Sequence, residues 1–440
     1  MYKDTAVTPS VWTSDPGTMA QETAKYRWPR LVQGMVDDVF ETSTELPPSP
    51  ALDEIKSIQT KLHNLKDEII ADGELSMLEE DGSEDIAAYN RLLFDLGTLT
   101  WLNCPWLYGE CYLYRRVQVL FSKTSFWKEY DIFKRQKDST LIKSQKAVEE
   151  LATRFNQVIA NTAKPLKSLD DDAARLVFIE ITELALWGNA TDLSLLTNLS
   201  LEEIQTLQGR AAIEESQKNI VDNDIQHVWN YLRKGQLTRT DRHIDIVLDN
   251  AGFELFADIL YTAYLIESGL ATSITLHAKC FPWFVSDVIP SDMGFLLEHL
   301  QSIGLESITN MIKRYLELGL VRVEVHPFWT TGFSFHEMTT EAPELFKRFQ
   351  DSHLTIWKGD LNYRKLTRDG LWPHTTPFKS AIGPLGHGSG VKVLVLRTNK
   401  SDTCVGIDSE EKVESLDREV PGKGWVRNGK HAVISFSNGI

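Results

Sequence analysis

The segment from His243 to Gly269 constrains the fold of this chain more than any other segment. It begins with a mostly apolar run, residues 244–248, whose length and composition predict a buried strand of a parallel sheet. Two adjacent polar residues, Asp249 and Asn250, follow where this strand should end. Apolar residues then recur at helical spacing from Phe253 onward. Because ligands of open α/β sheets bind beyond the carboxyl ends of the strands, we expect the chemistry of the protein here.

Strand and helix patterns alternate from residue 242 to the end of the chain. This alternation indicates right-handed crossovers and therefore a mainly parallel sheet. We predict an α/β fold, with a Rossmann-like three-layer αβα domain over residues 241–440. The predicted strands are 244–248, 273–277, 320–325, 354–357, 392–396 and 431–436, and the predicted helices are 252–268, 291–303, 307–318 and 343–352.

Residues 1–240 are predicted to form a mainly α-helical N-terminal region. An apolar stripe at three- and four-residue spacing runs from Ile55 to Ile69, which is typical of an amphipathic helix. The acidic segment 71–85 contains glycines and is expected to be an exposed loop. Helical patterns continue to about Leu232, so we expect helices throughout this half.

The composition restricts the partners of the chain. Its formal net charge is −16 at pH 7, whereas nucleic acids and anionic membranes attract basic surfaces, so we expect neither as a partner. No apolar stretch is long enough to span a bilayer, and the N-terminus lacks a signal-peptide core. The four cysteines show no paired spacing, which is typical of a reducing compartment. We expect a cytoplasmic protein, with the nucleus as an alternative; a monomer is plausible, and the sequence leaves the oligomeric state open.

Polar side chains follow four of the predicted strands. Asp249-Asn250 is the first group, and Ser286-Asp287 is the second. The segment 357–372 is unusually basic for so acidic a chain, and the segment 397–400 adds further cations. Carboxylate or amide oxygens together with several cations at one sheet edge suit a metal-bound anion, most simply phosphate.

Each of these groups also has an ordinary structural explanation. An Asp-Asn pair after a strand often forms a turn or a helix cap, Asp287 could cap the next helix, and a basic segment is usually a solvated surface. Other motifs fail: the chain has no P-loop, no GxGxxG after a strand and no GxSxG. LDNAG lacks the second Asp of haloacid dehalogenase-type phosphatases, and His277, Cys280 and His326 lack paired zinc spacing.

Several long motifs resemble blocks of one known family. DNAGFELFADI, LHAKCFPWFVSDV, KGDLNYRKL and an RTxK motif at 397–400 are similar to the DUF89 family, within its eukaryotic subfamily of damage-control phosphatases or acidic residue methyltransferase 1-like proteins. KYRWPRL, WLYGECYLYRR and WGNATDLSLL extend the resemblance into the helical half. WGNATDLSLL carries Ala190-Thr191 where Lys-Cys is expected, which we interpret as a tolerated variation.

The resemblance implies a helical N-terminal region packed on a Rossmann-like domain. It implies a divalent transition metal (Mn²⁺, Co²⁺ or Ni²⁺) held by Asp249, Asn250 and Asp287. It also implies hydrolysis of small phosphomonoesters such as fructose 1-phosphate and related sugar phosphates. The expected contacts to substrate phosphate are Asn362, Tyr363, Arg364, Lys365, Arg397, Thr398 and Lys400.

The same subfamily suggests an alternative, an S-adenosylmethionine-dependent protein carboxyl (glutamate) O-methyltransferase with Glu254 and Asp287 as cofactor contacts. A methyltransferase of the common class usually has a glycine-rich turn where this chain has Asp249-Asn250, so the residues favour the phosphatase. A non-catalytic scaffold is a third interpretation, and it leaves the polar strand ends unexplained.

For a phosphatase, the expected catalytic residues are Asp249, Glu254 and Lys400. Glu254 lies one helical turn beyond Asn250, where it could act as a general base or orient a ligand. The helical half is expected to supply a lid and a pocket for the leaving group. Weaker candidates for that pocket are Glu110, Arg115, Arg116, Asn189 and Asp192.

Overall fold

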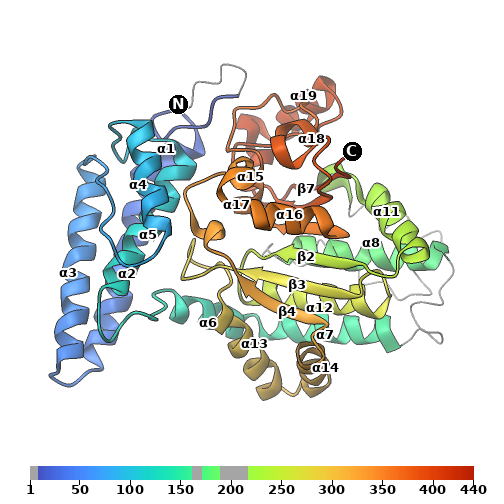
Figure 1. Cartoon of the computed structure of the whole chain (residues 1–440), viewed down its shortest axis with the longest axis horizontal. Helices are drawn as coiled ribbons and strands as arrows, with labels where there is room; N and C mark the ends of the chain where they lie inside the picture. Colours follow the sequence, from blue (N-terminus) through green and yellow to red (C-terminus); the bar gives the residue numbers. More distant parts are fainter. Residues whose placement is uncertain (1–7, 161–170, 189–216) are drawn as a thin grey trace.

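The strands form one seven-stranded sheet in the order β1-β7-β6-β5-β2-β3-β4 (Figure 1). The computed structural model describes residues 8–160, 171–188 and 217–440. Neighbouring strands are parallel except β6 and β7, which are antiparallel. The strands are β1 (Ile220–Asn223), β2 (His243–Val247), β3 (Ser273–Ala278), β4 (Val321–Val325), β5 (Leu354–Lys358), β6 (Val393–Thr398) and β7 (Ala432–Ser437).

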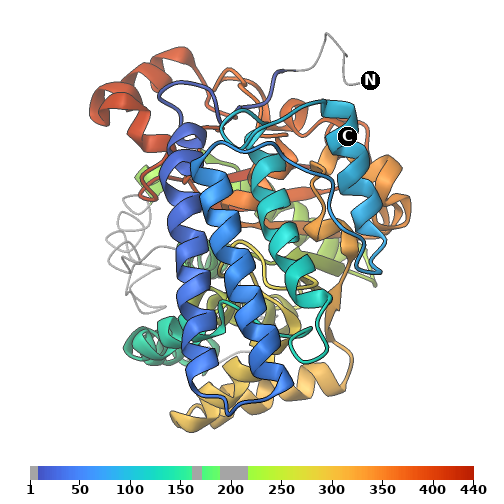
Figure 2. The same cartoon turned by 90° about the vertical axis from the view of Figure 1, so that its left-hand side faces the viewer.

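The N-terminal helices stand side by side at one end of the molecule, where α2 packs along α3 and α3 along α5 (Figure 2). No helix in the described ranges is long and apolar enough to cross a membrane. The helices of this half are α1 (Met19–Glu22), the π-helix η1 (Thr23–Arg27), α2 (Trp28–Thr44), α3 (Pro50–Ile70), α4 (Asp85–Leu96), α5 (Trp106–Ser122), α6 (Lys134–Lys143), α7 (Gln145–Ala160), α8 (Asp171–Trp187) and α11 (Ile225–Thr238).

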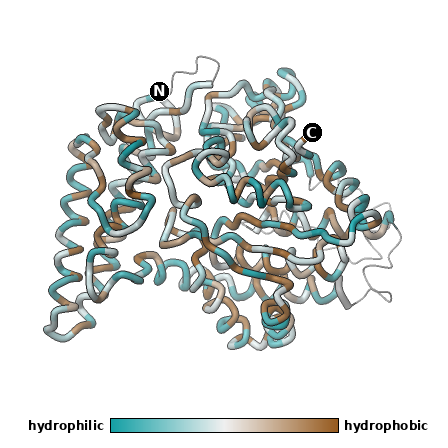
Figure 3. The backbone as a smooth tube through the Cα atoms, viewed as in Figure 1, coloured by the Kyte–Doolittle hydropathy of each residue, from teal (hydrophilic) through white to brown (hydrophobic). Residues whose placement is uncertain are grey.

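Alternate residues of a strand point to opposite faces of the sheet. Both faces are apolar here, and helices cover both. Ile244 and Ile246 of β2 pack in one core with α7, α8 and α12, whereas Val247 packs in the other core, which continues into α2–α5. Hydrophobic residues recur along these strands and the helices against them (Figure 3). The remaining α-helices are α12 (Phe253–Glu267), α13 (Pro290–Ser302), α14 (Glu306–Glu317), α15 (Met338–Glu341), α16 (Pro343–Asp351), α17 (Gly359–Leu366), α18 (Phe378–Ala381) and α19 (Glu410–Glu419).

The strand order reverses direction between β2 and β5. From β2 the sheet continues through β3 to β4, and from β5 it continues the other way to β6. The carboxyl ends of these five parallel strands lie at one edge of the sheet. Open α/β sheets bind ligands at such a reversal, because the connections diverge there and leave a crevice. Asp249 follows β2, and Gly359 follows β5, on its two sides.

The α/β prediction is confirmed, and each predicted strand and helix of the second half is present within a few residues of its expected bounds. The expectation of helices throughout the first half is wrong at β1, which adds a strand to the sheet edge beside β7. The segment 359–366, for which no helix was predicted, is the helix α17. The division of the chain into two domains near residue 240 stays a prediction.

Candidate active site

A polar cleft of about 470 Å³ opens at the reversal point. The loops after β2 and β3, the start of α17 and the loop after β6 form its floor. Helices η1 and α5 of the N-terminal half form a facing wall, and residues 427–429 also line the cleft. Two segments that are distant in the sequence therefore share one cavity, with the strand ends on one side and the helical half on the other.

The loop after β3 folds back so that Asp287 meets the end of β2. Asn250 and Asp287 form an antiparallel bridge, and Val288 N donates to Asp249 O at 2.8 Å. The reversal passes through Phe284 and Val285, whose φ angles of 44° and 71° lie in the left-handed region. Such a conformation is costly for non-glycine residues and recurs at functional sites. Here it lets the backbone deliver Ser286 and Asp287 to the cleft.

The Asp249 carboxyl group packs directly against the first residue of α17. A Cβ atom at Gly359 would overlap the Asp249 side chain, and Gly359 has a φ of 82°, so glycine satisfies both the space and the conformation. Burial raises the pKa of Asp249 well above its usual range, and the nearby Glu254 and Asp287 carboxylates raise it further. Carboxyl groups are therefore crowded in a small buried volume, where the ionised form of Asp249 is unfavourable without a cation.

The Asn250 side chain has a defined orientation at the edge of this volume. Its Nδ2 group donates to Asp249 Oδ2 and to Glu254 Oε2, both at 2.8 Å. Its Oδ1 atom accepts from Ser286 Oγ at 2.5 Å. Because the two carboxylates take both amide hydrogens, the amide oxygen points toward Ser286, a residue that lines the cleft.

Two buried lysines lie beneath the carboxylates. Lys279 Nζ is 2.9 Å from Asp287 Oδ2 and also donates to the Leu248 carbonyl at 2.9 Å. Lys358 Nζ is 2.7 Å from Asp258 Oδ1 and 3.4 Å from Glu254 Oε1. We define the buried charge cluster as Asp249, Glu254, Asp258, Asp287, Lys279 and Lys358, all buried. With all six groups ionised, its four carboxylates and two ammonium groups give a formal charge of −2, which a divalent cation would neutralise.

The residues beside the cleft can hold a metal ion only if an amide oxygen is one of its ligands. Within the described residues, no three Asp, Glu, His or Cys side chains are arranged to hold an ion. Asp249, Asn250 and Asp287 instead offer two carboxylates and one amide oxygen, which are ligands that hard or borderline cations accept. The excess negative charge of the buried cluster makes these residues a chemically reasonable metal site.

The side chains of α17 mostly stabilise the fold and do not line the cleft. Asn362 Nδ2 donates to the Lys358 carbonyl at 2.7 Å and to the Leu248 carbonyl at 3.2 Å, which ties α17 to β2 across the reversal point. Tyr363 Oη accepts from Val405 N at 2.9 Å, and Lys365 Nζ donates to Thr331 O at 2.7 Å. Asn362, Tyr363 and Lys365 therefore do not line the cleft, although the sequence predicted them as phosphate contacts.

Arg364 is the predicted cation of α17 that does line the cleft. Its guanidinium lies 3.6 Å above the Trp106 ring and donates to Glu110 at 2.7 Å. It also donates to both Asp369 oxygens, at 2.9 and 3.1 Å. An arginine held on several sides is pre-organised, because little side-chain entropy remains to be lost on binding.

The segment after β6 contributes Lys400 to the cleft. Arg397 and Thr398 are buried and do not line it, contrary to their predicted contact with phosphate. Arg397 Nε instead donates to Asp360 Oδ1 at 2.8 Å, and the Lys400 backbone N–H donates to the same oxygen at 3.0 Å. Asp360, which the sequence prediction did not include, therefore fixes this segment while it lines the cleft itself.

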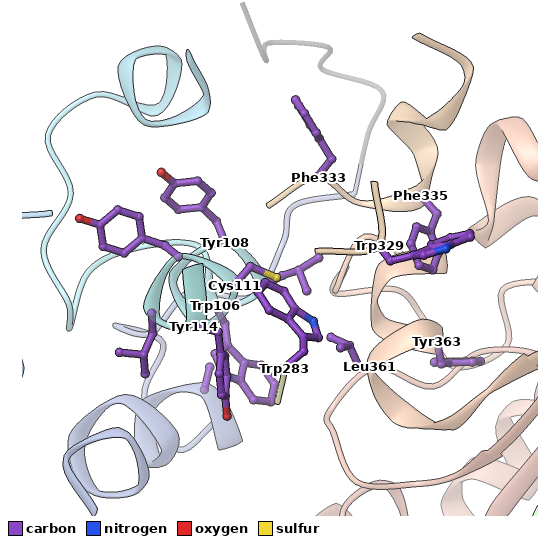
Figure 4. Packing of buried hydrophobic residues seen from close by; sticks show 14 of the residues in the cluster. Trp106, Tyr108, Cys111, Tyr114, Trp283, Trp329, Phe333, Phe335, Leu361 and Tyr363 are labelled. Atoms are coloured by element: carbon purple, nitrogen blue, oxygen red, sulfur yellow. The ribbon is translucent and has the colours of Figure 1, made fainter. Parts of the chain in front are cut away.

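The helical wall meets the strand-end loops through aromatic side chains. Trp106, Cys111 and Tyr114 of α5 lie on the side that faces Trp283 and Leu361 (Figure 4). The Tyr114 ring stacks on Phe284 with a centroid distance of 4.7 Å. This packing holds the left-handed turn at 284–285 against α5. Glu110, a weak sequence candidate, lines the cleft from the same helix.

Other predicted residues lie elsewhere. Arg115 is buried in ion pairs with Asp81 and Asp85 at 2.8 and 2.7 Å, and Arg116 pairs with Glu68 at 2.6 Å, so neither lines the cleft and their assignment to the pocket is wrong. The expected loop 71–85 supplies the two Arg115 partners. Asn189 and Asp192 lie outside the described residues.

Glu254 occupies a different position from the one expected. It is buried behind Asn250 and is absent from the residues that line the cleft. A general base must reach the proton that it removes, directly or through one water. The observed contacts of Glu254 instead suit a residue that orients Asn250.

The sheet and its polar crevice define an α/β protein with a ligand site at the carboxyl ends of parallel strands, as in other Rossmann-like proteins. Comparison with known families identifies the family within this class. The chain belongs to the damage-control phosphatase ARMT1-like family, whose domain model matches residues 23–416.

Curated relatives agree over nearly the whole chain. The Danio rerio damage-control phosphatase ARMT1 is 32% identical over 439 residues, which cover 96% of this chain and 95% of that protein. The Homo sapiens protein of the same name is 29% identical, covering 98% of this chain and 99% of its own length. A DUF89 family protein from Pyrococcus horikoshii aligns structurally over 94% of this chain and 97% of its own, with 15% identity and a TM-score of 0.41.

Proposed function

We propose that this protein is a metal-dependent phosphatase that hydrolyses small phosphomonoesters, with sugar phosphates such as fructose 1-phosphate as its substrate class. The observation that carries the proposal is the charge arrangement of the cleft. A buried cluster of net formal charge −2 lies beside the cleft, and Lys400, Arg364 and Arg27 also line it. This pairing of acidic and basic groups suits a dication and a phosphate dianion bound together.

Asp249, Asn250 and Asp287 would hold the ion, with Mn²⁺, Co²⁺ or Ni²⁺ as candidates. When bound, such an ion polarises a phosphoryl oxygen and lowers the pKa of a coordinated water. The protein contributes fixed oxygen donors. Asp249 is wedged against Gly359, Asn250 is oriented by two carboxylates, and Asp287 is held by Lys279. Their pre-organisation removes the reorganisation cost that flexible ligands would add.

The cations of the cleft stabilise charge on the transferring phosphoryl group. Lys400 lies at the floor on a segment that Asp360 holds in place, and Arg364 is fixed by Glu110 and Asp369. Fixed donors aimed at a developing negative charge act mainly in the transition state. In this proposal Lys400 and Arg364 supply that stabilisation, while Glu254 orients Asn250 and does not move a proton.

The cleft volume and its polar wall favour a small, hydroxylated leaving group. About 470 Å³ lies within the range of pockets that enclose small metabolites. Glu110 and Asp360 present carboxylate oxygens that can accept hydrogen bonds from sugar hydroxyls. Long polyanions are disfavoured by the net charge of −16, so nucleic acids should be poor substrates.

The contacts of Glu254 favour hydrolysis over methyl transfer. A cofactor contact has to reach the cleft, but Glu254 is buried between Asn250 and Lys358. The strand end also presents Asp249-Asn250 where a nucleotide-type cofactor generally needs a close backbone approach through glycine. These features support the phosphatase. For the methyltransferase, they leave no cofactor contact that is not also a candidate metal ligand.

The test is a side-by-side assay of both reactions. Purified protein is incubated with a panel of phosphomonoesters and each divalent metal, and phosphate release is measured beside methyl transfer from labelled S-adenosylmethionine. We expect metal-stimulated phosphate release, strongest for sugar phosphates, with no methyl transfer. Methyl transfer without phosphate release under every metal would reverse the assignment.

A further inference from the structure

Lys358 is the most enclosed cation near the candidate metal ligands. It is the last residue of β5, and it is 1% exposed. Its Nζ group is 2.7 Å from Asp258 Oδ1 and 3.4 Å from Glu254 Oε1, and it donates to the Ala185 carbonyl of α8. Because it is so buried and fully engaged, Lys358 is unavailable to a substrate.

A continuous chain of contacts joins Lys358 to the cleft. Glu254 faces Lys358 through Oε1 and accepts the Asn250 amide through Oε2 at 2.8 Å. Asn250 in turn accepts from Ser286 through Oδ1. The Lys358 ammonium therefore acts on one of the two carboxylates that orient the Asn250 amide.

We propose that Lys358 is a positioning residue for the metal site, acting through Glu254 to keep the Asn250 amide oxygen toward the cleft. The inference rests on the proposed metal dependence. Lys358 holds the Glu254 carboxylate in place as an acceptor for Asn250 Nδ2. Without this ammonium, the Glu254 and Asp258 carboxylates share a buried space with no cation between them, and their repulsion displaces Glu254 from its position. This displacement removes one of the two acceptors that orient the Asn250 amide, so the amide is less firmly held.

A purely electrostatic role for Lys358 predicts the opposite result. Removing a positive charge from a cluster of net charge −2 makes it more negative, so a cation should bind more tightly. Loss of positioning should instead weaken binding, because residues that orient metal ligands typically contribute 10–100-fold to metal affinity or activity. The sign of the change therefore separates the two roles.

The experiment measures Mn²⁺ affinity by calorimetry on metal-stripped, full-length protein. For Lys358→Met we expect Mn²⁺ binding to be weaker by about 10–100-fold. The double variant Lys358→Met/Asp258→Asn removes one charge of each sign, so the net charge of the cluster is unchanged and no carboxylate pair is left unbalanced. We expect its Mn²⁺ affinity to fall as well, whereas a charge effect alone predicts wild-type affinity. This variant decides the question if Lys358→Met fails to fold.

Lys137 provides a matched control. It is also a buried lysine between two carboxylates, 2.7 Å from Asp131 and 2.8 Å from Asp292, at a site that does not line the cleft. Lys137→Met should lower thermal stability without weakening Mn²⁺ binding. Equal or tighter Mn²⁺ binding by the Lys358 variants, with normal binding by wild type, overturns the inference alone. Absence of Mn²⁺ binding by wild type overturns the proposed function together with it.

Discussion

The two sides of the cleft differ in how firmly their charged groups are held. At the strand ends, Asp249 and Asp287 are buried, and Lys279, Gly359 and Asn250 surround them closely. On the helical wall, Arg27 is exposed, and within the described residues its guanidinium forms no ion pair or hydrogen bond. It follows Tyr26 in a π-helical turn, a local feature that is frequent at functional sites.

This difference separates two requirements of a phosphatase. Groups that bind a metal and a transferring phosphoryl group must be fixed before the substrate arrives, because their benefit comes from not having to reorganise. Groups that recognise the remainder of the substrate act mainly on binding and can be exposed. We therefore expect substitutions at the strand ends to affect turnover, and substitutions on the helical wall to affect KM.

The largest effect is expected at the metal ligands. Asp249→Ala and Asp287→Ala each remove a carboxylate donor, and metal polarisation is worth several kcal/mol, which corresponds to about 10³-fold or more in turnover. Bound metal, measured by elemental analysis, should be lost in both variants while their circular dichroism spectra stay native. A variant that keeps both its metal and its turnover would remove that residue from the ligand set.

Lys400→Ala should produce the next largest effect. Loss of one pre-organised donor to the transition state typically costs about 10²–10³-fold in turnover. Metal content should match wild type, because Lys400 acts on the phosphoryl group and not on the ion. Near-normal kcat for this variant would reduce the RTxK segment to a structural turn and weaken the distinction between the two sides.

Arg27→Ala should raise KM for a sugar phosphate by about tenfold, which corresponds to about 1.4 kcal/mol, with a smaller change in kcat. The expected loss is modest because an exposed cation is partly screened by solvent. Arg30→Ala is the matched control, since Arg30 is an exposed arginine of the following helix that does not line the cleft. Equal KM shifts in the two variants would indicate a general charge effect.

Arg115→Met should leave turnover unchanged and act only on stability. Arg115 pairs with Asp81 and Asp85, and removing one partner of a buried ion pair costs about 3–5 kcal/mol. Denaturant unfolding should show this loss, while kcat and KM of the folded fraction match wild type. A selective loss of activity at unchanged stability would show that Arg115 acts in the pocket, although it does not line the cleft.

The sequence predicted the strand-end side of this comparison far better than the helical side. Apolar runs of strand length and the polar residues after them are local signals, so β2 and Asp249-Asn250 were accessible from the sequence alone. The four residues of β1 were not, because two of them are polar and the strand lies at the sheet edge. Its pairing with β7 depends on residues about two hundred positions away.

Buried ion pairs escaped prediction for a similar reason. Arg115 and Lys365 are charged, so the sequence suggested binding residues, but their partners come from distant segments and from backbone carbonyls. Lys358 and Asp360 flank Gly359, and a charged pair around a glycine at a strand end was the available signal for both. That signal could not show that Lys358 turns into the protein while Asp360 faces the cleft.

The central claim, that the strand ends form a metal-dependent phosphatase site, is tested most directly by titrating metal into stripped enzyme. Fructose 1-phosphate hydrolysis and Mn²⁺ binding are followed in the same preparation, for wild type and for Asp287→Ala. We expect no phosphate release without metal, recovery that parallels the binding of Mn²⁺ to wild type, and no recovery in Asp287→Ala. Full turnover by the metal-stripped wild-type protein would contradict the account.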